Sequence, residues 1–216
     1  MSESKLKYIS ILIIVLIPLT IVLSNVTYLA TNYNFYIKIY QNKNIYSDFS
    51  DDQILKSETQ NLLGYYRGEN ILDQNFYSDK AVRHLKDVRS LLIITKFLSF
   101  GFLILILVLS TLLYFSKAKK KLINACLRGS LTAVVLTAAI CVLLLLSFQQ
   151  LFLDFHLIFF RNSDWLFEPT DNLIRMFPQE FFISFAFYLA TNIIASALFI
   201  SLLALIVKKI NDKPNI

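Results

Sequence analysis

Four long stretches without a charged side chain constrain this chain more than any other feature. No Asp, Glu, Lys, Arg or His occurs in residues 8–37, 97–116, 129–153 or 181–207. A helix needs about 20 apolar residues to cross the hydrocarbon core of a bilayer. The stretches therefore predict an all-α membrane protein with four transmembrane helices. The pattern disfavours spanning β-strands, because they would be about 10 residues long and would alternate apolar with polar residues.

The first stretch begins like a secretory signal peptide, with Lys5 and Lys7 ahead of the apolar run. The run is longer than the core of a signal peptide, which is about 7–15 residues, and no cleavage site of the A-x-A type follows it. We therefore interpret this stretch as an uncleaved first transmembrane helix.

The basic residues predict how the four helices are oriented. The side that holds both termini and residues 116–129 carries ten of the 21 Lys and Arg residues but only two of the 15 acidic residues. Its net charge is +8, against −2 on the other side. Cytoplasmic loops are enriched in Lys and Arg, so both termini are expected in the cytoplasm. We expect the basic run at 117–121 to contact anionic lipid rather than nucleic acid, since no nucleic-acid recognition motif accompanies it.

This orientation divides the chain into seven predicted segments. Residues 1–30, 91–115 and 130–153 are the first three transmembrane helices, and 183–216 contains the fourth helix with a cytoplasmic tail. Residues 116–129 form a basic cytoplasmic loop. Residues 31–90 and 154–182 are the two extracellular segments, and together they predict a small mixed extracellular cap.

The first outer segment is expected to contain a strand and a helix. Apolar residues alternate with Tyr and Lys over residues 35–40, as they would in a half-buried strand. Ser50 and Gln53 have the spacing of a capping box, and Gly68 is a plausible end for the helix that follows.

Two further helix starts are predicted on the outer side. Ser78 is expected to cap a helix that continues directly into the second transmembrane span. Thr170 is expected to cap a short helix between Pro169 and Pro178.

Aromatic residues are concentrated on the same side. Residues 28–77 and 152–188 contain 23 of the 31 aromatic residues of the chain. Such a set forms either an interfacial belt or the wall of a pocket for acyl chains. A belt is typically rich in Trp and Tyr, whereas this set is rich in Phe, so the pocket is as well supported as the belt. The candidate substrate-binding residues are Phe76, Tyr77, Phe155, Phe159, Phe160, Arg161 and Trp165.

The two histidines of the chain, His84 and His156, both fall at the outer edge of a predicted span. Ionisable groups at this depth tend to mark function. Asp87 follows His84 by three residues and shares its helix face, so it is a candidate to orient that imidazole and favours it slightly as the base. Asp154 is a second supporting candidate, although a helix would point it away from His156.

Other chemistries find less support in the sequence. Cys126 and Cys141 lie at the cytoplasmic side and inside the third span, so neither reaches an outer-face histidine. The chain has no P-loop and no G-x-S-x-G motif, and its histidines lack the H-E-x-x-H spacing of a zinc site. Two alternatives to an enzyme stay open: axial ligation of a haem by the two histidines, and a non-catalytic sensor of lipids or peptides.

The residues around the two histidines resemble one known family. The first context includes Tyr77-Ser78 and His84-Leu85-Lys86-Asp87, and the second runs from Phe155-His156 through Trp165, Pro169 and Asp171 to Phe181-Phe182. This pattern is similar to that of the bacterial lipoprotein intramolecular transacylases. The chain departs from the family pattern at Ala81, where that pattern has an acidic residue, so a supporting contact to His84 is either lost or supplied by Asp79.

The resemblance implies an acyltransferase of the bacterial plasma membrane that needs no cofactor and no metal. Its substrate is a lipoprotein whose N-terminal cysteine carries a diacylglyceryl group and a free α-amine. The sn-2 acyl chain moves to that amine and leaves a lyso-form lipoprotein. His84 and His156 match the two catalytic histidines of the family, and the active site is expected on the extracellular side. The expected partners are this lipoprotein and membrane lipid, and not nucleic acid.

Overall fold

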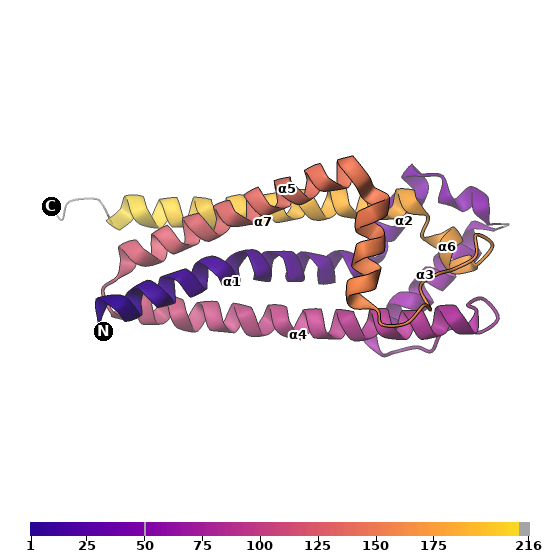
Figure 1. The fold of residues 1–216 in the computed structure, drawn as a ribbon, viewed down its shortest axis with the longest axis horizontal. Helices are drawn as coiled ribbons and strands as arrows, with labels where there is room; N and C mark the ends of the chain where they lie inside the picture. The colour runs from indigo at the N-terminus through magenta and orange to yellow at the C-terminus, as the bar shows by residue number, and fades with distance from the viewer. Residues whose placement is uncertain (50, 212–216) are drawn as a thin grey trace. The chain divides into compact units, whose positions relative to one another are not determined.

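The computed structural model describes residues 1–49 and 51–211, and this part of the chain contains helices and no strand (Figure 1). The elements are α1 (Glu3–Ala30), α2 (Tyr33–Asn42), the 3-10 helix η1 (Ile45–Asp48), α3 (Asp52–Arg67), α4 (Asp79–Phe115), α5 (Lys119–Phe159), α6 (Asn172–Met176) and α7 (Gln179–Asn211).

Four of these helices are long and apolar enough to cross a membrane: α1, α4, α5 and α7. This confirms the four predicted spans. The second span continues upstream as one helix from Asp79, as expected. Most of the predicted loop at 116–129 is helical, because α5 already begins at Lys119. The helical path of α5 is interrupted at Ser147, whose φ of −158° and ψ of 76° are non-helical.

The chain forms two compact units. Unit 1 comprises Met1–Val26, Thr95–Val142 and Leu189–Ile216. Its core joins all four long helices, with Ile13 and Ile17 of α1 packed with Leu113 of α4. Small residues of α5 and α7 complete this core, as is usual where membrane helices approach closely: Ala125, Ala133 and Ala197.

Unit 2 comprises Thr27–Ile94 and Leu143–Tyr188, and aromatic rings hold much of it together. Phe35 of α2 contacts the rings of Phe181, Phe185 and Tyr188 of α7 at centroid distances of 6.3, 5.6 and 5.4 Å. Edge-to-face ring pairs of this kind contribute beyond the area that they bury.

The strand predicted over residues 35–40 is wrong, because these residues belong to α2. Asn32 caps the helix by accepting a hydrogen bond from the Phe35 amide. The buried side chains are Phe35, Tyr36, Ile39 and Tyr40, which is helical spacing. The sequence suggested a strand only while the two tyrosines were counted as polar and exposed, but both are buried. The outer segments are therefore helical, not mixed, in the described residues.

The predicted helix ends are partly correct. Ser78 caps α4 by accepting a hydrogen bond from the Ala81 amide at 3.2 Å. Gly68 ends α3 with a φ of 87°, a backbone conformation that favours glycine. Asp171, not Thr170, caps α6, because its carboxylate accepts from the Leu173 amide. Asp51, not the predicted Ser50, caps α3, because its carboxylate accepts from the Gln53 amide; Ser50 itself lies outside the described residues.

Candidate active site

Unit 2 brings the two histidines together. His84 lies in the second turn of α4, and His156 lies in the last turn of α5, beyond the interruption at Ser147. Their ring centroids are 6.1 Å apart and their planes are inclined by 27°. Both side chains are buried, with 8% of His84 and 7% of His156 exposed. Residues 72 positions apart in the sequence thus place two buried imidazoles side by side.

Aromatic rings surround this pair. Phe160 lies against both imidazoles, at centroid distances of 4.8 Å from His84 and 5.5 Å from His156. Trp165 lies 4.9 Å from His156, and Phe167 lies 5.6 Å from His84. An apolar shell of this kind excludes water and strengthens electrostatic interactions inside it.

Hydrogen bonding distinguishes the two imidazoles. Nδ1 of His156 lies 2.7 Å from the backbone oxygen of Phe152. A carbonyl oxygen only accepts, so this nitrogen donates and carries the proton. Neutral His156 therefore has its lone pair on Nε2. The Nδ1 atom of His84 is buried and has no hydrogen-bond partner among the described residues. Since burying an unpaired donor is costly, the neutral ring is best satisfied with its proton on Nε2.

Neither supporting carboxylate forms a hydrogen bond with a histidine within residues 1–49 and 51–211. Asp87 accepts from the side-chain amide of Asn162 at 2.8 Å, and Asp154 accepts from that of Gln150 at 2.8 Å. At Ala81, where the family pattern has an acid, the side chain is fully buried, and the neighbouring Asp79 is exposed. The orientation of the imidazoles thus comes from packing and from the Phe152 carbonyl.

The segment 160–171, which follows α5, is tied to one face of α4. Lys80 donates to the backbone oxygen of Leu166. Arg83 forms a two-pronged ion pair with Asp164, at 2.9 and 3.0 Å. The Arg83 guanidinium holds the pKa of the Asp164 carboxyl below its usual range. Lys80, Arg83 and Asp87 are spaced by three and four positions along α4, so they lie on the helix face that carries His84. These bonds hold Trp165 and Phe167 beside the histidines.

Comparison with known proteins identifies the family. A model of the family described as "Lipoprotein intramolecular transacylase Lit" matches residues 11–182, well over half of the chain. The chain belongs to the Lit family. It is therefore an acyltransferase, and the family match favours this over the haem-binding and sensing alternatives.

Solved Lit structures share the fold. The transacylase Lit from Bacillus cereus matches with a TM-score of 0.87 and 20% identity, over 98% of this chain and 100% of that chain. A variant of the same protein with one histidine replaced by arginine matches with a TM-score of 0.82, 20% identity and coverage of 97% and 96%. The corresponding alanine variant also gives 0.82 and 20%, with 97% coverage of both chains. No curated protein sequence matches the chain.

The candidate substrate residues fall into two groups in this Lit family member. Phe160 and Trp165 contact the histidines, and Phe155 lies 5.4 Å from His156. Phe159 is one contact removed, since its ring packs on Phe155 at 4.8 Å. Arg161 is exposed and forms no ion pair within the described residues.

Phe76 and Tyr77 lie elsewhere in the unit. Phe76 stacks on Phe49 at 6.3 Å, and its backbone oxygen accepts from Asn172. Tyr77 is buried, and its hydroxyl lies 3.5 Å from the sulfur of Met176. The structure gives neither side chain a contact with the histidines, so both serve the packing of unit 2.

Sequence reasoning missed two groups of residues at this site. The ring centroids of Phe152 and His156 lie 4.2 Å apart. The sequence could have revealed this contact, because residues four positions apart on one helix are neighbours. The bonds from Lys80 and Arg83 to segment 160–171 join residues about 80 positions apart. The spacing of Lys80 and Arg83 on one face of α4 could be recognised in the sequence, but their partners in the irregular segment 160–171 could not.

Proposed function

We propose that this chain moves the sn-2 acyl chain of a diacylglyceryl-modified bacterial lipoprotein to the α-amine of the lipoprotein's N-terminal cysteine. The product is the lyso-form lipoprotein, with an amide at the cysteine and a free glyceryl hydroxyl. The observation that carries the proposal is the pair of buried imidazoles 6.1 Å apart in an aromatic shell, in a member of the Lit family.

His156 acts as the general base in this proposal. The α-amine has a pKa of about 8, so part of it is protonated and unreactive near neutrality. The neutral amine attacks the ester carbonyl carbon, the new C–N bond forms, and Nε2 of His156 accepts a proton from the nitrogen. The bond to the glyceryl sn-2 oxygen then breaks, and this oxygen receives the proton.

His84 is the donor in the same step. With its proton on Nε2, it can hydrogen-bond to the carbonyl oxygen as negative charge develops there. Asp87 is hydrogen-bonded to Asn162 and not to His84 within the described residues, so its contacts do not assign His84 as the base. Two imidazoles at this separation are close enough to serve the nitrogen and the oxygen of one tetrahedral centre.

The aromatic shell supports an intramolecular reaction. Nucleophile and ester belong to one molecule, so the enzyme needs no nucleophile of its own. Well-oriented intramolecular reactions reach effective molarities of about 10⁵–10⁸ M, provided that the reacting atoms are held in place. Rings such as Phe160 and Trp165 would hold the glyceryl arm and keep out the water that would hydrolyse the ester.

The proposal includes an orientation in the bacterial plasma membrane. Lys and Arg are concentrated on the side of the termini, so both termini are cytoplasmic and the histidines face the extracellular side. Diacylglyceryl groups lie at this depth, with the cysteine at the headgroups and the acyl chains in the lipid.

His84→Ala and His156→Ala test the proposal. Each should lower the rate of lyso-lipoprotein formation by at least about 10², the low end of what general acid–base catalysis contributes. The assay is co-expression with a diacylated reporter lipoprotein. Substrate and product are isomers of equal mass, so tandem mass spectrometry must locate the acyl chain on the amine or on the glyceryl group.

A matched control removes the other candidate nucleophiles. The double variant Cys126→Ser, Cys141→Ser should keep the activity, because neither thiol belongs to the unit that carries the histidines. Full activity in either histidine variant, with the variant as well folded as the wild type, would refute the role of that histidine.

A further inference from the structure

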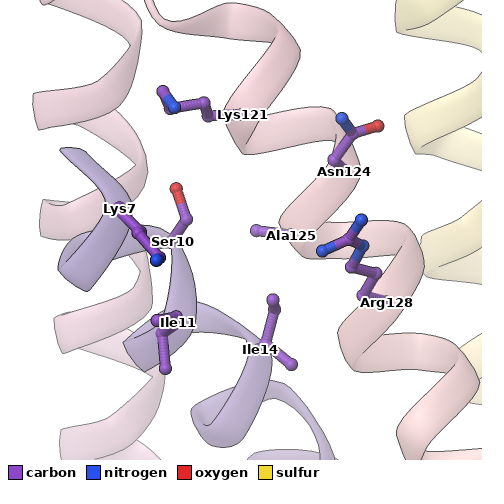
Figure 2. Close-up of a pocket in the computed structure, with 8 residues that line it drawn as sticks. All are labelled: Lys7, Ser10, Ile11, Ile14, Lys121, Asn124, Ala125 and Arg128. Carbon is purple, nitrogen blue, oxygen red and sulfur yellow. The ribbon is translucent and has the colours of Figure 1, made fainter. Parts of the chain in front are cut away.

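Unit 1 contains a basic cavity that the proposed acyl transfer does not use. It lies between the first turns of α1 and the first turns of α5 and has a volume of about 320 Å³ (Figure 2). Three cations line it: Lys7 from α1, and Lys121 and Arg128 from α5. Its position along α5 differs from that of His156, which lies in the last turn of the same helix.

Two contacts between α1 and α5 bracket this cavity. Lys121 forms an ion pair with Glu3 at 2.6 Å. At Gly129, an added Cβ would lie 3.0 Å from the Ile17 side chain and 3.2 Å from the backbone oxygen of Ile14. A side chain at this position would be tighter than most Cβ contacts and would require Ile17 or Ile14 to shift, so glycine favours the close approach of the two helices here.

The charge of the cavity is not balanced by the protein. Glu3 is the one acidic residue of unit 1 among residues 1–26, 95–142 and 189–211, and it is already paired with Lys121. The side chains of Lys7 and Arg128 form no ion pair or hydrogen bond within the described part of the chain. Two unpaired cations facing one cavity favour an anionic ligand.

Polar groups suited to a phosphate accompany the cations. The side-chain amide of Asn124 lines the cavity and has no hydrogen-bond partner within residues 1–49 and 51–211. An amide donor beside Arg and Lys is the usual setting for a phosphate group, because the guanidinium and the ammonium both form charge-assisted hydrogen bonds with its oxygens.

The cavity lies at the boundary between charged and apolar sequence. Lys7 directly precedes the charge-free stretch 8–37, and Arg128 directly precedes the stretch 129–153. The cavity is also lined by Ile11, which is 45% exposed, and the neighbouring Tyr8 is 71% exposed. In a bilayer this is the depth of the phosphates, with apolar side chains directly beneath for acyl chains.

We propose that this cavity binds the phosphate ester of an anionic phospholipid, with Lys7, Arg128 and Asn124 as the residues that contact the phosphate. Basic pockets between membrane helices bind lipid headgroups in this way. In the proposed orientation the lipid comes from the inner leaflet. The site is independent of the acyl-transfer proposal, because it involves neither histidine.

The test uses the purified full-length protein in detergent micelles. Phosphatidylglycerol should raise the melting temperature of the wild type, and phosphatidylcholine should not. In the double variant Lys7→Gln, Arg128→Gln, the phosphatidylglycerol concentration that gives half of the maximal rise in melting temperature should increase at least tenfold. The matched control Lys208→Gln, Lys209→Gln removes the same charge from the end of α7 and should behave as the wild type does.

Three results would overturn the proposal. The first is that phosphatidylcholine raises the melting temperature as much as phosphatidylglycerol does. The second is that the control variant loses as much affinity for phosphatidylglycerol as the Lys7, Arg128 variant. The third is that millimolar inorganic phosphate stabilises the protein and phosphatidylglycerol does not, which would assign the cavity to a soluble anion. Native mass spectrometry of the wild type with equal amounts of both lipids decides the question even when the variant fails to fold. Preferential retention of phosphatidylglycerol supports the site, and equal retention refutes it.

Discussion

The role predicted for Asp87 changes because of a single hydrogen bond. Its spacing from His84 suggested a carboxylate that orients the imidazole, but it accepts from Asn162 at 2.8 Å. We therefore predict that Asp87→Asn lowers the rate of acyl transfer by less than the factor of about 10² that marks the loss of an acid–base group. The amide oxygen of the new side chain can still accept from Asn162.

Parallel assays of Asp87→Asn and His84→Ala with the reporter lipoprotein check this prediction. A loss in Asp87→Asn as large as that in His84→Ala would restore the carboxylate as the group that orients the ring.

The residues of the site differ in how far the sequence could reveal them. The histidines and Trp165 stood out because these residue types are rare in the chain, whereas Phe160 was a candidate only as part of the aromatic cluster beside His156. The tautomer of His156 was not predictable, since it depends on the Phe152 carbonyl and on backbone geometry near the end of α5. Residue type suggests what a side chain can do, whereas its partner decides what it does.

At the scale of elements, the segment 160–171 depends on its bonds to α4. Arg83→Ala and Asp164→Asn each remove the ion pair that holds it. Trp165 is the one tryptophan of the chain and lies beside His156, so its fluorescence reports on this segment. We predict a red-shifted emission in both variants, because the indole loses its apolar surroundings. Lys86→Ala, an exposed position on the same helix, should leave the emission unchanged.

Acid should also shift the Trp165 emission of the wild type to the red. Because the ion pair lowers the pKa of Asp164, its stabilisation is complete above the ordinary value of 3.8 and is lost as the pH falls through the folded-state pKa. A fluorescence titration should therefore show a red shift below pH 3.8 in the wild type, and a smaller acid-induced change in Asp164→Asn. An unchanged spectrum in both substituted proteins at neutral pH would mean that other contacts hold the segment.

Helices were predictable where local signals were strong. The four spans follow from length and apolarity, and the start of α4 and the end of α3 follow from Ser78 and Gly68. The helix α2 was missed because Tyr is ambiguous in a pattern: Tyr36 and Tyr40 are buried and both pack on the ring of Phe181 of α7, about 140 residues away. Such long-range packing overrides a short alternating pattern, and no local signal reports it.

At the scale of the whole molecule, the asymmetry of charge is the feature that connects fold and function. The basic side carries Lys7, the run at 117–121 and Arg128, whereas most acidic residues fall in residues 31–90 and 154–182. The same asymmetry predicts the orientation of the four helices and leaves the cavity of unit 1 positively charged. The proposed extracellular position of the histidines therefore depends on this predicted orientation.

Single cysteines introduced into the Cys126→Ser, Cys141→Ser background test this orientation. Ser163→Cys, on the segment beside the histidines, should react with a membrane-impermeant maleimide in intact bacteria. Lys120→Cys, at the start of α5, should react only after the membrane is permeabilised. Both positions are exposed in the structure, so a difference in labelling reports the side of the membrane rather than burial. The reverse pattern would place the histidines on the cytoplasmic side and refute the proposed orientation.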